Sequence, residues 1–534
     1  MINAWGVQMK RVRKPEPVRY ADLREVVFHA AEQFPDTRFF LSADDAMPHV
    51  TGRELKSLCG GYAPWAERRG FAGRHIALLG PNSAAWLSAF FAVISGGGVA
   101  VPLHLGSKTE ELTHCLRRSE SAVLIYDAAC AEDVVPLRET LPEVGLIELH
   151  AFLEQLRAEP EQRFPPLPQD APAALYFTSG TTALSRCVIL THRNMGSHCS
   201  TAMSQLPLSP KDKGLSVLPC SHTFEIMTTI VGALHCGGTL YINENLLTVK
   251  ANLKKHEPTI LVVVPLVLQM LHKEIVRTAR RQGKLELLQK GLRINRFAQR
   301  LGVDLSRRLF ADVFDVLGGN LRYFLCGGAA LDPELIDFFH CLGITVLQGY
   351  GITECSPIVA ANIPGANRPG SIGRTFPCCE TALIDGEICV RGDSVSPGYF
   401  SDPEANEAAY SGGWFHTGDL GRIDRDGYLY FTGRKKNLIV LSNGENVSPE
   451  LLEEKLYRVE GVEDAVVYEK NGKITAEVYP DAQLLPDRAA VWREVDRVNL
   501  TLKPHEQIGA LILRSEPFEK TATQKIKRKS TKER

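Results

Sequence analysis

The stretch Leu175-Tyr-Phe-Thr-Ser-Gly-Thr-Thr182, continued by Ala183-Leu-Ser-Arg-Cys-Val-Ile-Leu190, decides how this chain folds. Two apolar runs, 173–177 and 187–190, have the character of buried strands, and a helix is expected after His192. The small and hydroxylated residues between the runs are hard to place in a core. Gly180 lets the backbone approach a ligand closely, and the neighbouring hydroxyl and N–H groups can donate to phosphate oxygens. The segment is not a Walker loop, because no Gly-Lys-Ser/Thr follows. A Ser/Thr turn between two strands is the alternative.

Length and composition limit the class of protein. A chain of 534 residues exceeds one ordinary core and indicates two or more domains. The 61 basic and 62 acidic residues give a net charge of −1, so no nucleic-acid partner is expected. The 13 cysteines contain no Cys-x-x-Cys pair, which favours reduced thiols and a cytoplasmic location over a zinc ribbon or a disulfide scaffold. The N-terminal residues lack the apolar segment of a signal peptide.

One stretch is long and apolar enough to suggest a membrane span. Residues 84–103 run for 20 positions without a charge. However, Gly96-Gly-Gly98 interrupts the stretch, so we expect a buried helix over 82–95, a glycine turn and a short strand over 99–101. No transmembrane span is predicted, while peripheral contact with a membrane stays open.

Alternating patterns predict an α/β fold. Apolar residues at helical spacing predict a helix over 21–34, and Ser107-Lys-Thr-Glu110 is the pattern of a capping box that opens a further helix. A helix is also expected across 223–235. Repeated alternation of strands and helices favours mostly parallel sheets flanked by helices. The predicted strands cover 75–79, 99–101, 122–126, 215–218, 239–242, 260–264, 322–326 and 344–347.

The remaining segments suggest a connector, a basic helical region and a second domain. Residues 151–172 have the composition of a surface connector, and residues 272–315 are helical and unusually basic. A solvated helical face is the default explanation for those charges, and a binding patch is the alternative. Asp424-Arg-Asp-Gly427 indicates a hairpin. From 436 onward the order β, α, β, β, α, β suits a separate small domain.

The segment Gly349-Tyr-Gly-Ile-Thr-Glu354 carries groups suited to a nucleotide. Tyr350 between two glycines presents an aromatic face for stacking on a purine, Thr353 offers a hydroxyl to a phosphate, and Glu354 offers a carboxylate to Mg²⁺. A glycine turn around a buried tyrosine is the alternative.

Taken together, the motifs resemble those of the adenylate-forming (AMP-binding) enzymes, which include acyl-CoA synthetases. The phosphate loop 177–182 with Thr191-His-Arg-Asn194, the Gly-Tyr-Gly-x-Thr-Glu motif and Trp414-Phe-His-Thr-Gly-Asp419 occur in the family's order. Tyr430 to Glu450 resembles the hinge region, and Lys520 to Arg528 resembles the catalytic-lysine loop. The resemblance implies a large N-terminal domain, 1–435, of mostly parallel sheets with a β-subdomain, and a small mobile α+β domain, 436–534.

The resemblance also implies the site residues. Lys525 would bridge the substrate carboxylate and the α-phosphate, Glu354 would hold Mg²⁺ beside Thr353, and His222 would gate the acyl site. A lone histidine is often structural, so that alternative is kept for His222. The residues implied to bind ATP are Thr178, Ser179, Gly180, Thr181, Thr182, Arg186, Gly328, Ala329, Gly349, Tyr350, Gly351, Asp419, Arg434 and Lys436.

Some positions depart from the family pattern. Where the family has Gly-x-Pro-Lys-Gly, this chain has Ala183 to Cys187, with Arg186 in place of the lysine, and Gln524 replaces the glycine before Lys525. The charge is kept, but the loop is expected to close over a triphosphate less readily.

The motifs look most like those of bacterial long-chain fatty acid–CoA ligases. The implied function is ATP-dependent activation of a medium- or long-chain fatty acid, or another carboxylate, to an acyl-adenylate and then transfer to a thiol. CoA is the first choice of acceptor, and the phosphopantetheine of an acyl carrier protein is the alternative. A degenerate, non-catalytic nucleotide- or acyl-binding protein is the third possibility.

Overall fold

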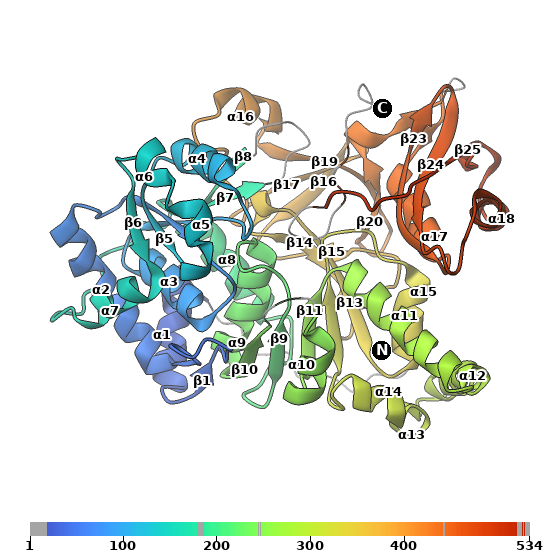
Figure 1. The fold of residues 1–534 in the computed structure, drawn as a ribbon, viewed down its shortest axis with the longest axis horizontal. Helices are drawn as coiled ribbons and strands as arrows, with labels where there is room; N and C mark the ends of the chain where they lie inside the picture. Colours follow the sequence, from blue (N-terminus) through green and yellow to red (C-terminus); the bar gives the residue numbers. More distant parts are fainter. Residues whose placement is uncertain are drawn as a thin grey trace.

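A computed structural model describes residues 19–178, 186–243, 245, 247–441, 444–520, 526 and 528. Figure 1 shows a large α/β part, coloured blue through yellow to light orange, and a smaller part with α-helices and β-strands, coloured deeper orange to red. The predicted fold class is therefore confirmed. Across the described residues, no helix is long and apolar enough to cross a membrane.

The first sheet contains the strands on either side of segment 179–185. It is six-stranded, in the order β6-β5-β3-β4-β7-β8, and all neighbours are parallel except β7 and β8. The uncharged stretch supplies α3 (Ala84–Ser95), which is buried along its whole length, so it is a core helix as predicted. The strands are β3 (His75–Leu79), β4 (Val99–Pro102), β5 (Ser121–Tyr126), β6 (Gly145–Glu148), β7 (Pro172–Thr178) and β8 (Arg186–Thr191).

The second sheet is twelve-stranded and changes character part-way across. Its first strands, β10-β9-β11-β12-β13, are parallel, and those that follow, from β14 onward, are antiparallel. The strands are β9 (Lys213–Ser216), β10 (Thr239–Ile242), β11 (Ile260–Val263), β12 (Tyr323–Cys326), β13 (Thr345–Gly351), β14 (Ile358–Ala361), β15 (Gly373–Thr375), β16 (Glu380–Ile384), β17 (Glu387–Arg391), β18 (Tyr410–Ser411), β19 (Trp414–Ile423) and β20 (Tyr428–Arg434).

Helices cover both sheets of the large part. The predicted helix over 21–34 is α1 (Leu23–Gln33), and the helix expected after His192 is α8, which begins at His192 itself. The other helices are α2 (Gly52–Arg69), α4 (Thr109–Arg118), α5 (Ala131–Val134), α6 (Leu137–Thr140), α7 (Leu149–Arg157), α8 (His192–Met203), α9 (Val231–Cys236), α10 (Val249–His256), α11 (Pro265–Arg281), α12 (Leu285–Arg300), α13 (Ser306–Leu309), α14 (Ala311–Val316), α15 (Pro333–Cys341) and α16 (Pro403–Ala409); β1 (Arg38–Phe39) pairs with β2 (Val50–Thr51).

Three local predictions were wrong in detail. The N-cap of α4 is Lys108, which makes no side-chain cap bond, so the capping box at Ser107 does not form. The predicted connector begins with α7, whose buried Phe152, Leu153 and Leu156 pack into the core. The helix expected across 223–235 starts as a π-helix, Glu225–Ile230, before α9.

The small part has the predicted element order, except that two short strands stand where one was expected before the first helix. A short pair, β21 (Ile439–Val440) and β22 (Asn446–Val447), precedes α17 (Pro449–Tyr457). A three-stranded sheet of β23 (Val462–Lys470), β24 (Lys473–Pro480) and β25 (Ala510–Leu513) follows, with α18 (Arg488–Asn499) between its last two strands. Its core is a separate apolar cluster around Leu456, Val467 and Val491.

Charged side chains join the small part to the large one. Arg458, which follows α17, lies 2.6 Å from Asp332 and 3.2 Å from Glu334 at the start of α15. Arg280 of α11 pairs with Glu460, and Lys273 Nζ donates to the Val462 carbonyl at 3.0 Å. The small part therefore rests on α11 and α15 of the large part.

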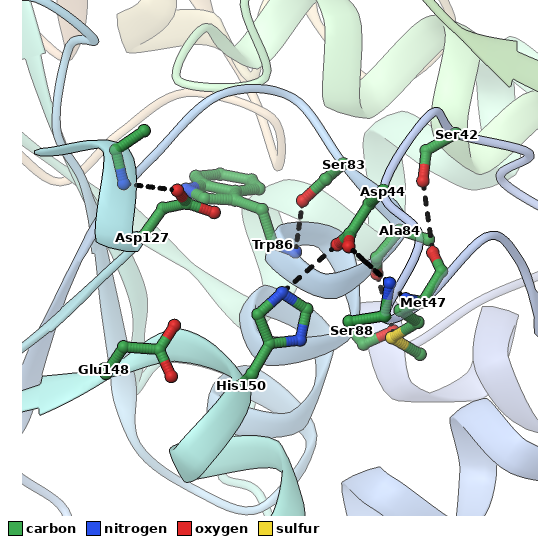
Figure 2. Close-up of polar contacts among 12 residues, drawn as sticks. Ser42, Asp44, Met47, Ser83, Ala84, Trp86, Ser88, Asp127, Glu148 and His150 are labelled. Atoms are coloured by element: carbon green, nitrogen blue, oxygen red, sulfur yellow. Dashed lines mark hydrogen bonds and ion pairs between the residues drawn. The ribbon is translucent and has the colours of Figure 1, made fainter.

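The carboxyl ends of β3, β5 and β6 carry a group of polar side chains (Figure 2). Ligands of open α/β sheets bind at such ends, so this edge is a candidate for a binding site. Ser83, Asp127 and Glu148 each accept a hydrogen bond from a nearby backbone N–H, and each caps the helix that follows. His150 lies 3.3 Å from Asp44. These side chains hold chain turns in place, which directs attention to the second sheet.

Candidate active site

The Gly349-Tyr-Gly motif lies where the second sheet changes from parallel to antiparallel. The first half of β13 pairs in parallel with β12, and Gly349 to Gly351 pair with β14 in the antiparallel direction. A Cβ at Gly351 would lie 2.1 Å from the Pro357 carbonyl oxygen, so only glycine fits there. The motif therefore marks a junction of two sheet regions, and Tyr350 is half-buried at it rather than exposed as the sequence suggested.

Tyr350 is directed at Asp419. Its hydroxyl donates to Asp419 Oδ2 at 2.8 Å, and Arg434 Nε lies 3.2 Å from Asp419 Oδ1. Asp419 and Arg434 stand opposite each other on β19 and β20, so the register of the hairpin sets their contact. Burial and the Asp419 charge raise the pKa of Tyr350 well above its usual value, so the hydroxyl remains a donor. We call Tyr350, Asp419 and Arg434 the Asp419 cluster.

A second line of polar contacts runs from Glu354 to Arg186. The Tyr399 hydroxyl donates to Glu354 Oε1 at 2.9 Å. The Arg186 guanidinium lies over the Tyr399 ring, 5.0 Å from its centroid, and Nη1 is 3.4 Å from the Tyr399 hydroxyl. Burial raises the pKa of Glu354, although the Tyr399 hydroxyl and the Arg186 charge act in the opposite direction. The Glu354 carboxylate thus has a hydrogen-bond donor, the Tyr399 hydroxyl, and a cation, Arg186, near it.

Sequence analysis missed Tyr399. It belongs to the segment Ser396-Pro-Gly-Tyr-Phe400, which runs beside β8: Ile189 N–H donates to the Gly398 carbonyl at 3.0 Å, and Phe400 N–H donates to the Cys187 carbonyl at 2.7 Å. Ser396 Oγ also donates to the Ile189 carbonyl at 2.6 Å. These long-range contacts bring Tyr399 to Arg186, and no local pattern signals them.

The phosphate-loop residues Ser179, Gly180, Thr181 and Thr182 lie outside the described residues, as does Ala183. The two ends of that segment, Thr178 and Arg186, face each other across the antiparallel ladder of β7 and β8. Cys187 is a buried residue of β8 paired with Phe177. Its φ is not in the left-handed region, so replacing the family's glycine there brings no backbone strain.

The segment after β12 contains a required glycine. Gly328 has φ of +89°, a conformation that other residues rarely adopt, and a Cβ at Gly327 would approach the Phe224 ring to 3.1 Å. Gly328 and Ala329 are exposed on this turn, which leads into α15. The turn is therefore open to solvent at these two residues.

His222 lies in a loop held by distant residues. Asn82 donates to the Leu218 carbonyl at 2.7 Å and accepts from Cys220 N–H at 2.9 Å. His104 follows β4, and the centroid of its ring lies 4.7 Å from the centroid of the His222 ring. Burial lowers the pKa of His104, which favours its neutral form. Sequence analysis singled out His222 but not His104.

Glu225 begins the π-helix three residues after His222 and is fully buried. Thr229 Oγ1 donates to its Oε2 at 3.0 Å. Burial raises the pKa of Glu225 to about 8, so the side chain is mostly a neutral acid at pH 7. We call residues 216–230 the His222 segment; a π-helical turn of this kind is often found at functional sites.

Two lysines follow β20 at the predicted hinge. Partial loss of solvent and the Arg434 charge lower the pKa of Lys436, while Asp419 acts in the opposite direction. Lys435 Nζ lies 3.2 Å from Glu387 Oε2, and Glu387 Oε1 accepts from Gly418 N–H at 2.7 Å. Glu387 therefore connects Gly418, which precedes Asp419, to Lys435, which precedes Lys436. Sequence analysis missed Glu387.

Lys525 lies outside the described residues. The residues on either side, Lys520 and Ile526, form an antiparallel bridge. Ile526 packs with Phe518, Val466 and Tyr468 on the small part. Thr353, in contrast, lies at the start of a short 3₁₀ turn, directly before Glu354.

Comparison with known proteins identifies the family. Residues 27–400 match the model of the AMP-binding enzymes, and residues 436–534 match the AMP-binding enzyme C-terminal domain. The chain belongs to the AMP-binding enzyme family. The predicted resemblance to adenylate-forming acyl-CoA synthetases is thereby confirmed.

The relatives found by sequence are acyl-CoA synthetases. The fatty acyl-CoA synthetase A of Dictyostelium discoideum is 31% identical over 494 residues, which cover 83% of this chain and 74% of that protein. The long-chain-fatty-acid–CoA ligase FadD15 of Mycobacterium tuberculosis is 29% identical over 523 residues, 87% of each chain.

Solved structures share the fold. The anthranilate CoA ligase AuaEII in complex with anthranoyl-AMP matches 97% of both chains with a TM-score of 0.80 and 19% identity. ATP-bound MatB from Rhodopseudomonas palustris matches 95% of this chain and 97% of its own, with a TM-score of 0.76 and 23% identity.

Proposed function

We propose that this protein is an AMP-forming fatty acid–CoA ligase that activates a long-chain fatty acid with ATP and transfers the acyl group to CoA. The observation that carries the proposal is the Asp419 cluster beside the line Glu354–Tyr399–Arg186. A buried carboxylate for ribose hydroxyls comes from β19, a carboxylate for a cation comes from the 3₁₀ turn after β13, and a guanidinium for phosphate comes from β8 of the first sheet. The names of the relatives support the fatty acid and CoA.

The reaction accounts for these groups. An oxygen of the substrate carboxylate attacks the α-phosphorus of ATP, the bond to pyrophosphate breaks, and an acyl-adenylate forms; a thiol then attacks the acyl carbon and AMP leaves. Negative charge accumulates where carboxylate and triphosphate meet, so fixed cations and donors lower the barrier. Asp419 would orient the ribose, Arg186 would face the phosphates, and Gly328 to Ala329 with Tyr350 would border the adenine.

Glu354 fits the role of a magnesium ligand, because carboxylate oxygens are the ligands that Mg²⁺ prefers in proteins. Tyr399 orients this carboxylate from one side at 2.9 Å. When bound there, Mg²⁺ would neutralise phosphate oxygens of the triphosphate. Thr353, the preceding residue, would offer its hydroxyl to the same phosphates.

We also propose the division of the chain into domains 1–435 and 436–534, with the pivot at Lys436. Lys525 would act in adenylate formation only, because it meets the carboxylate and the α-phosphate before pyrophosphate leaves. Lys525→Ala is then expected to abolish adenylate formation and to leave thioester formation from supplied acyl-adenylate largely intact. Lys527→Ala, two residues away, is the control. Equal loss in both half-reactions would contradict this role.

A pyrophosphate-release assay tests the function as a whole. Carboxylates of increasing chain length are supplied with ATP and Mg²⁺, once with CoA and once with acyl carrier protein as acceptor. Release with a long-chain acid, completed by acyl-CoA formation, supports the proposal. Transfer to the carrier protein alone would instead identify an acyl–carrier protein ligase. Binding of ATP or acid without release from any carboxylate would identify a non-catalytic binding protein.

A further inference from the structure

Large apolar side chains lie exposed along one side of α12. Leu287 is 66% exposed, Ile294 43%, Phe297 64% and, directly after the helix, Leu301 68%. Their spacing of seven, three and four residues places them in one stripe along the helix. Single exposed apolar residues are ordinary, but four large ones along one side of a helix mark an interaction surface. We call these four residues the α12 stripe.

The opposite side of α12 is fixed to the large domain. Leu288, Gly291, Asn295 and Gln299 are its buried residues. Asn295 Nδ2 donates to the Cys341 carbonyl at 2.8 Å, and Gln299 Nε2 donates to the His340 carbonyl at 3.0 Å, both at the end of α15. Turning the helix to bury the stripe would break these bonds, so the stripe faces outward in the folded protein. In Figure 1, α12 lies at the outer edge of the molecule.

Exposed basic side chains lie on α12 near the α12 stripe. Lys290, Arg293 and Arg300 are exposed, and in the described part of the chain they form no ion pair, whereas Arg296 is paired with Asp337. Helical spacing places Lys290 within the stripe and Glu286, Arg293 and Arg300 along one border of it. Glu286 is the acidic residue exposed on this helix. The surface therefore combines apolar bulk with unpaired positive charge.

This combination decides between possible occupants. Pairing the stripe with that of a second copy would bring Lys290 and the bordering arginines of both copies together, and like charges repel. A single helix with an apolar stripe and one mainly basic border matches helices that lie in the surface of an anionic bilayer. We infer that α12 docks this protein on anionic membranes, with the α12 stripe in the headgroup region. The inference goes beyond the proposed ligase activity and does not depend on it.

Vesicle co-sedimentation of the full chain tests the inference without measuring catalysis. The protein is expected to bind phosphatidylcholine vesicles that contain phosphatidylglycerol, more weakly as salt is added, and to bind pure phosphatidylcholine poorly. The double variants Phe297→Ser/Leu301→Ser and Arg293→Glu/Arg300→Glu should each weaken binding by roughly tenfold or more. Matched controls are Leu500→Ser, an 87% exposed leucine elsewhere, and Arg425→Glu, an exposed arginine of a hairpin turn.

Three results would overturn the inference. The first is that the protein does not bind anionic vesicles, or that both double variants bind them as the parent does. The second is a parent dimer in analytical ultracentrifugation that Phe297→Ser/Leu301→Ser dissociates, which would assign the stripe to a second copy. The third is loss of binding to acyl carrier protein in Arg293→Glu/Arg300→Glu with vesicle binding unchanged, which would assign it to an acidic protein. Unchanged thermal midpoints confirm that the variants are folded.

Discussion

The Asp419 cluster and the His222 segment use buried carboxyl groups in opposite ways. Asp419 is 4% exposed but has a guanidinium at 3.2 Å and a phenol at 2.8 Å. Glu225 is fully buried, and the hydrogen bond it receives comes from a neutral hydroxyl, Thr229. The nucleotide side of the site thus supplies partners to a charge, whereas the proposed acyl side removes the charge by keeping the proton. Each arrangement suits the ligand proposed for it, a polar ribose in one case and an apolar chain in the other.

The largest effect is expected where Glu225 is replaced by glutamine. The pKa of Glu225 is about 8 in the fold against an ordinary 4.5. Below the lower value both states hold the proton; between the two values the unfolded chain releases it and the folded chain retains it. The free energy of unfolding therefore falls as the pH rises towards 8, by an amount on the order of several kcal/mol.

Glu225→Gln should remove much of this pH dependence. The measurement is the difference in thermal midpoint between about pH 5 and pH 8 for parent and variant. Glu161→Gln, at an exposed glutamate, is the control and should keep the parent's difference. If Glu225→Gln keeps the parent's pH dependence, the contrast between the two carboxyl groups is wrong.

Asp419→Ala should affect ATP and spare the acyl substrate. The variant loses the proposed ribose contacts and also leaves the Tyr350 hydroxyl and the Arg434 charge without this partner. Hydrogen bonds to charged groups contribute about 1.5–3 kcal/mol, so ATP affinity should fall roughly ten- to a hundredfold. Calorimetry with ATP measures it, and Asp426→Ala, an exposed aspartate of the adjacent hairpin, is the control. Equal losses for ATP and fatty acid would mean that the two sides of the site are not separate.

The two sides were also unequally predictable from sequence. Tyr350, Glu354, Asp419 and Arg434 lie in short motifs, and hairpin register alone brings Asp419 to Arg434. The strands around segment 179–185 and the element order of the small domain were likewise predicted, because local periodicity determines them.

The contacts that complete the site depend on segments far apart in the chain. Tyr399 reaches Glu354 through pairing of 396–400 with β8, and His104 reaches His222 from the end of β4. Glutamate is usually charged and exposed, so a sequence pattern assigns Glu225 to the surface. The fold nevertheless buries Glu225 completely. The exposed stripe of α12 was missed for the converse reason, since apolar periodicity alone predicts a core face.

Tyr399→Phe should have a smaller effect than Asp419→Ala because it acts on a substrate contact through Glu354. The ring that carries Arg186 remains, while the hydroxyl that orients the carboxylate is lost. We expect kcat/KM for ATP to fall by about tenfold or less, with a higher Mg²⁺ concentration needed for half-maximal rate. A purely structural role would leave that concentration unchanged. Tyr410→Phe, whose ring is 6.4 Å from Tyr399, is the control.

The smallest effect is expected for Arg186→Lys, which restores the family's residue at the end of the phosphate loop. In this chain the planar guanidinium lies over the Tyr399 ring at 5.0 Å, and an ammonium cannot reproduce that flat contact. A cation–π contact at an exposed site contributes about 0.5–1 kcal/mol, so kcat/KM for ATP should fall about two- to fivefold. Arg422→Lys, which loses a similar contact with Tyr430 at 3.7 Å on the outer hairpin, should leave the rate unchanged. A faster Arg186→Lys enzyme would show that arginine is a handicap at this position; a slower one would show that Arg186 and Tyr399 work as a pair, so that the nucleotide side has adapted to its own arginine.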